Sequence, residues 1–189
     1  MSGQSKSNAG VQTTGLKRQT STNLEKYYTC PDVAQYCMEL LATHLLLQSD
    51  DICIEPSAGN GAFIPHIHNM FEYSLFYDIS PEHPEIVEQD YLTLDERGFV
   101  EYPRKHIVGN PPFGRQSSEA IKFIKKSAKF AHSISFILPR SFKKESMKKH
   151  FPLEYHLVCE EDIAKNAFLI NGEQYDVPCV FQIWEKKDT

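Results

Sequence analysis

The hallmarks of membrane, secreted and metal-bound proteins are scarce in this sequence. No apolar run approaches the roughly 18–20 residues of a membrane span, and the longest candidate is interrupted by His44 and Gln48. Residues 1–19 lack the apolar block of a secretory signal. The five cysteines form no C-x-x-C pair, which argues against a zinc site and against a disulfide framework. We therefore expect an intracellular protein of a reducing compartment, the cytoplasm or the nucleus, without membrane contact or bound metal.

Two further absences limit the chemistry and the domain organisation. No Gly-Lys-Ser/Thr follows the glycine-rich segment at 59–61, which excludes a Walker-type phosphate loop. The 189 residues suffice for one globular domain with a sizeable core, but not for a catalytic domain joined to a large recognition domain. The N-terminal segment is rich in Ser, Gln, Asn, Thr and Gly. We therefore expect a disordered tail over 1–24 and a single domain over 25–189.

Helices and strands alternate along the expected domain. Hydrophobic periodicity and the Pro and Gly signals predict helices over 31–48, 62–70, 117–131 and 141–150. The same signals predict strands over 51–55, 73–78, 106–109 and 133–138. Further strands are expected between 155 and 185, around a turn at Asn171-Gly172. Such alternation is typical of βαβ units, so we expect an α/β fold with a mostly parallel sheet and helices on both faces.

Charge is distributed unevenly behind the net value of −5. Residues 32–103 carry fourteen acidic residues and one basic residue, whereas residues 104–150 carry twelve basic residues and two acidic ones. A basic block inside an acidic chain indicates a face that meets phosphates. Lysine-rich helix faces that are merely solvated give the same pattern, so charge alone leaves the two interpretations equal.

A glycine-rich loop follows the strand expected at 51–55. It reads Glu55-Pro-Ser-Ala-Gly-Asn-Gly-Ala-Phe63, in which Gly59 and Gly61 let the backbone turn sharply and approach a ligand closely. A second acid, Asp78, ends the next expected strand. An acid at that place either accepts hydrogen bonds from ribose hydroxyls or is simply solvated. The pairing fits a nucleoside ligand without a pyrophosphate.

A second motif, Val108-Gly-Asn-Pro-Pro-Phe-Gly114, comes directly after another expected strand. Two consecutive prolines fix the backbone, so their carbonyl groups point in set directions. Asn110 adds a side-chain acceptor and Phe113 adds an aromatic face. Rigid acceptors beside an aromatic ring suit a planar base with an exocyclic amine, although a rigid turn with Phe113 in the core would also contain these residues.

These segments resemble the class I S-adenosylmethionine-dependent methyltransferases of the amino-methylating branch, in particular the adenine-N6 type. The signature of that branch is (D/N/S)-P-P-(Y/F/W), and Asn-Pro-Pro-Phe is one accepted form. Tyr27-Tyr-Thr-Cys-Pro31 is similar to the Tyr-Thr-x-Pro segment that precedes the glycine loop in the adenine-type enzymes. The resemblance covers about residues 26–185. It implies a Rossmann-like fold with a C-terminal antiparallel strand pair, and S-adenosyl-L-methionine as the cofactor.

The resemblance also implies a set of cofactor-binding residues. The methionine end would be bordered by Tyr28, Thr29 and Pro31. The amino-acid and ribose portions would be wrapped by Glu55, Pro56, Ser57, Gly59 and Gly61. The ribose hydroxyls would bind Asp78, and the adenine would contact Ile79, Asp90 and Tyr91. Asp90 would accept from the adenine amine, although an Asp at this place also suits a loop.

The target and its phosphates would meet the second motif and the basic block. The target base would be held by Asn110, Pro111, Pro112 and Phe113, with Asn110 also at the boundary of the cofactor site. Arg115 and Arg140 follow expected strand ends at the edge of the sheet that carries the two motifs, so they are the candidate phosphate contacts. The implied substrate is an exocyclic amine of nucleic acid, foremost N6 of adenine in DNA or RNA, in a single strand or flipped out of a duplex.

Two other functions remain open from the sequence. Protein glutamine N-methyltransferases also use Asn-Pro-Pro followed by an aromatic residue. A non-catalytic cofactor-binding scaffold subunit would retain the same fold. The small size of the chain makes a protein partner or a homodimer an expected source of target recognition.

Overall fold

The computed structural model describes residues 28–163, 168–170, 173–175 and 178–188. Two expectations therefore lie outside the described residues. These are the disordered tail over 1–24 and the turn at Asn171-Gly172.

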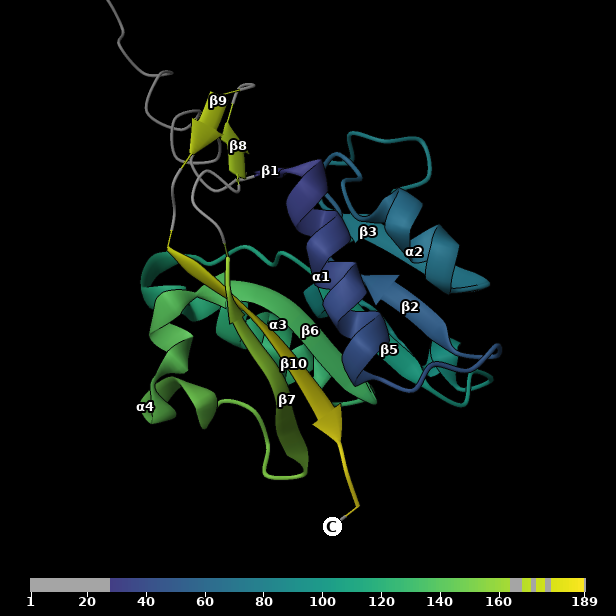
Figure 1. Ribbon diagram of the computed structural model, residues 1–189. Helices are drawn as coiled ribbons and strands as arrows, with labels where there is room; N and C mark the ends of the chain where they lie inside the picture. Colours follow the sequence, from purple (N-terminus) through teal and green to yellow (C-terminus); the bar gives the residue numbers. More distant parts are fainter. Residues whose placement is uncertain (1–27, 164–167, 171–172, 176–177, 189) are drawn as a thin grey trace, which may run out of the picture.

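A seven-stranded sheet forms the middle layer of the structure (Figure 1), in the order β4-β3-β2-β5-β6-β10-β7. The strands are β2 (Ile52–Glu55), β3 (Tyr73–Asp78), β4 (Val87–Glu88), β5 (Lys105–Gly109), β6 (Ser133–Pro139), β7 (Tyr155–Asp162) and β10 (Cys179–Lys186). Neighbours from β4 to β6 pair in parallel, whereas β10 pairs antiparallel with both β6 and β7. The mostly parallel sheet with C-terminal antiparallel pairing is thus confirmed. Parallel neighbours need long crossover connections, which explains the alternating pattern of the sequence.

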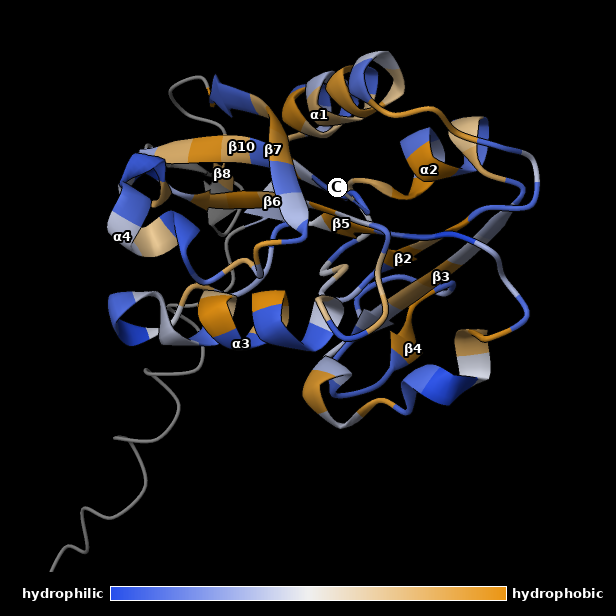
Figure 2. Ribbon diagram, turned by 90° about the horizontal axis from the view of Figure 1, so that it is seen from below, coloured by the Kyte–Doolittle hydropathy of each residue, from blue (hydrophilic) through white to orange (hydrophobic). Residues whose placement is uncertain are grey.

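Helices cover both faces of this sheet (Figure 2). Helices α1 (Pro31–His44) and α2 (Ile64–Met70) pack on one face, and α3 (Ser118–Ser127) packs on the other. Each face has its own hydrophobic core, with Met38 and Phe181 in the first and Phe123 and Phe136 in the second. No helix in the described part of the chain is both long and apolar enough to cross a membrane.

Three predicted helices are shorter or more broken than the periodicity suggests. The helix expected over 117–131 ends at Ser127. Helix α1 ends at His44 because Leu45 is extended (φ −113°, ψ 139°), although leucines continue to residue 47. The helix expected over 141–150 is instead a 3₁₀ turn, η4 (Arg140–Lys143), followed by α4 (Glu145–Lys148). Lys144 between them is extended, with ψ 141°. Burial of the Phe142 ring in the core holds η4 against the sheet, so the segment cannot continue as one regular helix.

A separate three-stranded sheet lies beyond the carboxyl ends of the central strands (Figure 1). Its two later strands fall within the region 155–185 where strands were expected, whereas its first strand was not predicted. The sheet consists of β1 (Tyr28–Thr29), β8 (Phe168–Ile170) and β9 (Glu173–Tyr175), in the order β1-β8-β9. Thr29 pairs with Phe168, whose side chain is 1% exposed and belongs to the core under α1. The small sheet therefore anchors the start of the described chain at the strand-end edge.

A buried polar network lies at the amino ends of the central strands β2, β5 and β6. The Asp51 carboxylate accepts from Arg104 Nε at 2.9 Å and contacts His106 Nε2 at 2.8 Å. The other ring nitrogen of His106 lies 2.7 Å from Ser133 Oγ. Burial alone would raise the pKa of Asp51, but hydrogen bonds from the Gln48 N–H, His106 and Arg104 hold it below its ordinary value. Because Asp51, His106 and Ser133 are almost fully buried, we interpret the network as structural.

Replacing Asp51 by alanine is expected to lower the free energy of unfolding by about 3–5 kcal/mol, because Arg104 and His106 lose a buried partner. The contribution of Asp51 to stability is present above the carboxyl pKa of the unfolded chain, about 3.9. It is lost as the pH falls through the lowered pKa of the folded state. Denaturant unfolding between pH 7 and pH 2 measures both effects. The matched variant is Asp50→Ala at an exposed neighbour, expected within about 0.5 kcal/mol of wild type. Equal losses for the two variants would contradict the structural role.

Candidate functional site

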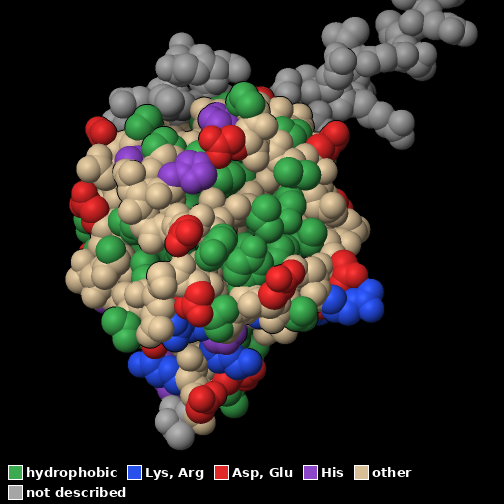
Figure 3. Space-filling model, turned by 90° about the vertical axis from the view of Figure 1, so that its right-hand side faces the viewer, with side chains coloured by type: hydrophobic (Ala, Val, Ile, Leu, Met, Phe, Trp, Pro, Cys, Tyr) green, Lys and Arg blue, Asp and Glu red, His purple; other side chains and the backbone are tan. Residues whose placement is uncertain are grey.

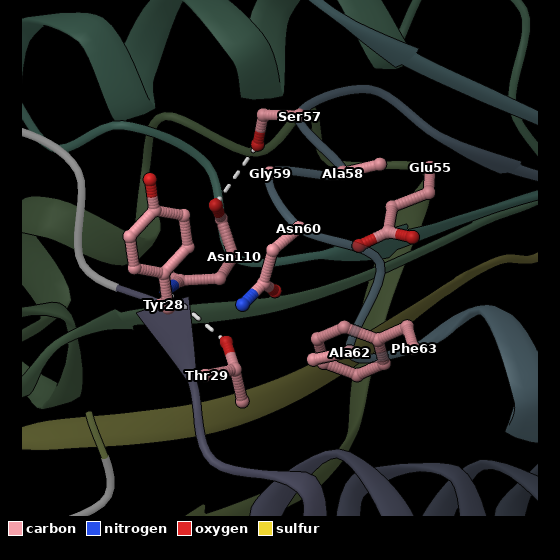
Figure 4. Close-up of a pocket in the computed structure, with 10 residues that line it drawn as sticks. All are labelled: Tyr28, Thr29, Glu55, Ser57, Ala58, Gly59, Asn60, Ala62, Phe63 and Asn110. Carbon is pink, nitrogen blue, oxygen red and sulfur yellow. Dashed lines mark hydrogen bonds between the residues drawn. The ribbon is translucent and has the colours of Figure 1, made fainter. Parts of the chain in front are cut away.

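A pocket opens at the carboxyl ends of β2 and β5, the edge where α/β sheets bind ligands. It holds about 250 Å³ of space, part of it open to solvent. Its walls come from β1, from the loop after β2 and from the turn after β5 (Figure 4). The lining residues are Tyr28, Thr29, Glu55, Ser57, Ala58, Gly59, Asn60, Ala62, Phe63 and Asn110. The structure thus brings together six predicted site residues from three separate stretches of the sequence.

The glycine loop has the backbone that its sequence predicts. Gly59 (φ +60°) and Gly61 (φ +90°) both lie in the region that favours glycine. A Cβ at Gly61 would lie 2.9 Å from His83 Cδ2, so the turn has no room for a side chain there. The Tyr28 ring lies over Gly59, where a Cβ would lie 3.6 Å from Tyr28 Cδ1. The loop therefore presents backbone groups to the pocket, and the aromatic ring of Tyr28 covers it at Gly59.

Glu55, the last residue of β2, contributes a buried carboxyl group to the pocket wall, on the side of Phe63 in Figure 4. Burial raises the pKa of Glu55 to about 8, and the nearby charge of Asp78 adds to the rise. Its Oε2 is buried and has no hydrogen-bond partner among the described residues. The adjoining strand allows this close packing, since a Cβ at Gly109 (φ +151°) would lie 3.1 Å from Glu55 Cγ. A buried acceptor of this kind suits a ligand that brings a donor or a cation.

Asp78, the last residue of β3, is fixed beside the glycine loop. Its carboxylate accepts from the Gly59 N–H at 2.9 Å and from the Ser80 N–H at 2.8 Å. The neighbouring Glu82 accepts from the Tyr28 hydroxyl at 2.7 Å. Burial, followed by this hydrogen bond, raises the pKa of Tyr28 to about 12. Glu82, which the sequence did not single out, thus ties β1 to the loop after β3.

The Asn-Pro-Pro-Phe turn contacts the glycine loop directly. The Ser57 hydroxyl donates to the Asn110 carbonyl oxygen at 2.9 Å, and Asn110 Nδ2 donates to Thr29 Oγ1 at 3.4 Å (Figure 4). Pro111 is buried and Pro112 is half-buried. The Phe113 ring is half-buried and packs against both hydrophobic cores. The first residue of the motif therefore lines the pocket, and the last one also has a packing role.

Backbone strain follows the turn. Gly114 has φ +69°, and a Cβ there would lie 2.9 Å from the Glu119 backbone nitrogen. Gln116 and Ser117 also have positive φ, at +54° and +63°, without being glycine. Such conformations cost roughly 1–2 kcal/mol per residue, and they are held here by hydrogen bonds from the start of α3 to the Phe113 carbonyl. Arg115 is exposed on this strained segment, directly beside the turn.

Several predicted cofactor residues lie around the pocket rather than in its wall. Pro31 is the exposed first residue of α1, and Pro56 is buried beneath the loop. Ile79 is 66% exposed next to Asp78, where its side chain is open to a ligand. Asp90 caps the 3₁₀ helix η1 (Tyr91–Thr93) by accepting from the Leu92 N–H at 3.0 Å. Asp90 is itself exposed, so the capping bond does not bury the carboxylate.

The expectation for the Tyr91 side chain is corrected by the structure. Its ring is 1% exposed and packs against Phe123 and Phe130 in the core under α3. Its hydroxyl lies 2.7 Å from Ser127 Oγ. The ring is therefore held in the core and is not available to a ligand in the pocket.

Four pocket residues were not assigned from the sequence, namely Ala58, Asn60, Ala62 and Phe63. All four lie inside the glycine-rich segment that was singled out. Their position within one tight loop was the signal that could have identified them, because every residue of such a loop lies near the ligand.

Much of the basic block is neutralised by nearby carboxylates. Lys126 of this block is buried, and its ammonium donates to the Leu94 carbonyl and to Glu96 Oε2. Beyond the carboxyl end of β6, Arg140 and Lys143 both form ion pairs with Asp162 Oδ1, at 4.0 and 3.1 Å. Within the described residues 104–150, the exposed bases without an ion pair within 4.0 Å are Arg115, Lys125, Lys129, Lys144 and Lys149.

The face formed around α2 and β3 has the opposite character. In Figure 3, acidic side chains are spread over this face, while Lys and Arg gather only along its lower border. This distribution agrees with the acidic stretch over 32–103. An anionic ligand would be repelled there, whereas the exposed bases of the basic block lie in and beside α3 and α4.

The pocket combines carboxylates, backbone amides and aromatic rings rather than a metal-binding set. No group of three or more His, Cys, Asp or Glu side chains that could hold a metal ion occurs in the described parts of the chain. None of the five cysteines is in a disulfide, and burial raises the pKa of Cys37 and of Cys53. The geometry suits an organic ligand with hydroxyl and cationic groups.

Comparison with known proteins identifies the fold. No protein-family model matches the sequence, and no curated protein matches it. A provisionally assigned RNA methyltransferase from Pyrococcus horikoshii is similar in structure, with a TM-score of 0.66, 14% identity and coverage of 92% of each chain. The 23S rRNA methyltransferase ErmE gives a TM-score of 0.58 and 14% identity over 86% of this chain and 70% of that one.

A third similar structure is larger than this chain. It is the modification subunit of a provisionally assigned type I restriction enzyme from Vibrio vulnificus, with a TM-score of 0.63 and 12% identity. The match covers 89% of this chain but 46% of that subunit. At these identities the similarities show the fold, which is the Rossmann-like fold shared by class I methyltransferases.

Proposed function

We propose that this chain is an S-adenosylmethionine-dependent methyltransferase that acts on an exocyclic amine of nucleic acid, with N6 of adenine as the favoured target. The observation that carries the proposal is the direct contact between the glycine loop and the Asn-Pro-Pro-Phe turn. Ser57 of the loop donates to Asn110 of the turn at 2.9 Å. A methyl donor held by the loop and an amine held by the turn would therefore be neighbours, as group transfer requires.

The pocket fits the proposed cofactor on three counts. The buried Oε2 of Glu55 provides an acceptor for the α-ammonium group, and Asp78 provides acceptors for ribose hydroxyls. Gly59, which lines the pocket, lets a ligand approach the backbone closely. When bound, the cofactor supplies a methyl group that its sulfonium makes electrophilic. The protein must then supply position and electrostatics rather than a strong nucleophile.

The turn would prepare the target amine. The lone pair of the adenine amine is delocalised into the ring, so the amine is a poor nucleophile. The Asn110 side-chain oxygen and the Pro111 carbonyl would accept hydrogen bonds from it, favour a pyramidal nitrogen and stabilise its developing positive charge. The exposed part of the Phe113 ring would stack on the base, which is worth about 1–3 kcal/mol.

The deciding experiment incubates the full chain with methyl-labelled S-adenosylmethionine and separate pools of DNA, RNA and protein. Digestion to nucleosides is expected to place the label in N6-methyladenine. Label in glutamine of the protein pool would instead support the glutamine methyltransferase. Cofactor binding by calorimetry without transfer to any pool would support the scaffold subunit.

Replacing Arg115 by alanine is expected to weaken nucleic-acid binding across many sequences and to reduce the salt slope of log K by about 1. Arg115 is exposed beside the turn and has no ion pair among the described residues, so a phosphate meets no internal competitor. The matched control is Arg97→Ala, since the Arg97 guanidinium is already paired with Asp95 at 2.8 Å. Fluorescence anisotropy with a labelled single strand at several salt concentrations makes the comparison. Equal slopes for both variants would remove Arg115 from the interface.

Arg140 is expected to contribute less than Arg115 to nucleic-acid binding, because Asp162 lies 4.0 Å away and competes with phosphate.

We also propose that target selection uses a protein partner or a second copy of the chain. Analytical ultracentrifugation of the chain with and without nucleic acid tests the second copy.

A further inference from the structure

Two hydroxyl groups from different elements contact Asn110, the first residue of the Asn-Pro-Pro-Phe turn. Ser57 donates to the backbone carbonyl of Asn110 at 2.9 Å, and Thr29 accepts from its side-chain nitrogen at 3.4 Å (Figure 4). The first contact fixes the main chain of Asn110 and the second orients its side chain. The two contacts therefore act on different degrees of freedom.

Thr29 has a rigid setting for this contact. It is 6% exposed and belongs to β1, where it pairs with Phe168 of β8. Phe168 is itself 1% exposed in the core under α1. The small sheet thus holds the threonine hydroxyl in place beside the turn.

The two ends of an amide differ in hydrogen-bonding character, so its rotation matters. The nitrogen can only donate and the oxygen can only accept, whereas a hydroxyl oxygen can accept. With the Asn110 nitrogen directed at Thr29, the oxygen is turned to another side. If the amide were rotated by a half turn, its NH₂ group would meet the target amine, which also carries donor hydrogens.

We propose that Thr29 is a positioning residue that sets the rotation of the Asn110 amide, so that its oxygen accepts from the target amine. The proposal rests on the proposed function and adds to it. Thr29 was expected only to border the cofactor, whereas here its hydroxyl acts on the target through Asn110.

The test compares Thr29→Val, which keeps the shape and removes the acceptor, with Thr29→Ser, which keeps the hydroxyl. In single-turnover methyl transfer the valine variant is expected to be about tenfold slower, and the serine variant is expected to recover most of the rate. Cofactor affinity, measured by calorimetry, should be similar for both. The control is Thr43→Val on α1, which removes a hydroxyl bonded to the Glu39 carbonyl at 3.0 Å, far along the chain from the turn.

A second background separates orientation from general support of the site. Asp is also an accepted first residue of the motif in the resembling family, and a carboxylate offers acceptors on both sides. In Asn110→Asp, adding Thr29→Val is therefore expected to cause no further loss. The same tenfold loss in both backgrounds would overturn the proposal.

A binding measurement gives a readout independent of methyl transfer. Single-stranded oligonucleotides with one adenine, or one purine lacking the exocyclic amine, are compared for each variant. Thr29→Val should lower the preference for adenine, and Thr29→Ser should not. This ratio is insensitive to partial misfolding and decides the matter even if Asn110→Asp is inactive. No transfer by wild type would overturn the proposed function, whereas wild-type transfer with equal valine and serine results would overturn the role of Thr29 alone.

Discussion

Replacing Asn110 by alanine is expected to slow single-turnover methyl transfer by a factor of about 10²–10³, the range found when one preorganised electrostatic group is removed from an active site. The side-chain oxygen is proposed to stabilise charge that develops on the attacked nitrogen, so its loss acts mainly on the chemical step. Cofactor affinity should change little, because the loop groups of Glu55, Gly59 and Asp78 are untouched. Rapid-quench kinetics on a verified substrate, together with calorimetry of cofactor binding, measure the two quantities.

The structure makes this variant interpretable. Alanine keeps the backbone carbonyl that accepts from Ser57 at 2.9 Å, so one of the two contacts that fix the turn survives. Thermal unfolding checks that the fold is retained, and Asn69→Ala on the exposed side of α2 serves as the matched control. A stable Asn110→Ala protein that binds cofactor and transfers methyl at the wild-type rate would rule out the proposed site.

Cofactor affinity is expected to increase about tenfold per pH unit from pH 6 towards pH 8 and then to level off. Burial, with the charge of Asp78, raises the pKa of Glu55 to about 8, so the carboxyl group is largely protonated at neutral pH in the free protein. A cationic α-ammonium group favours the ionised form, and binding must therefore release a proton. Calorimetry in buffers of different ionisation enthalpy measures this release directly.

Glu55→Gln is expected to abolish the pH dependence and to weaken cofactor binding by about 10–150-fold above pH 8, because a charge-assisted hydrogen bond is lost. The same ionisation acts on stability in the opposite direction. A carboxyl group whose pKa is raised in the folded state contributes to stability below its unfolded pKa, about 4.3. This contribution is lost as the pH rises towards 8. The glutamine variant should therefore be more stable than wild type at pH 8.5 without ligand. An unchanged pH slope in Glu55→Gln would show that another group titrates on binding.

Local motifs made the glycine loop and the catalytic turn predictable. The glycines at 59 and 61 need positive φ, and a proline pair after a strand fixes a turn, so residue types alone define those backbones. Strand β3 has the predicted bounds, Tyr73–Asp78, because a short, largely apolar run between turn signals is a local pattern. The fold class followed from the alternation of such patterns.

Long-range contacts were not predictable in the same way. Strand β1 forms because Tyr28 and Thr29 pair with β8, about 140 residues later, and no local signal specifies that partner. Tyr91 was assigned to the ligand, and Lys126 belongs to the basic block that was expected to meet phosphates or solvent, yet both side chains are buried in contacts with distant segments. Glu82 was missed for the same reason, since its contact with Tyr28 depends on how two loops meet.

The order of the strands in the two sheets bears on when the pocket is completed as the chain is synthesised. The strand is the last one along the chain, yet it lies between β6 and β7 in the sheet. Strand β1, which carries Tyr28 and Thr29 of the pocket wall, pairs with β8, and β8 leaves the ribosome shortly before β10. A nascent chain up to Asp162 therefore contains both motifs and the adjacent strands β2 and β5 that precede them, but lacks β8, which holds the β1 wall of the pocket. Ligand binding should begin only after β8 and β10 have been synthesised, and stalled nascent chains of increasing length would acquire it once these strands are present.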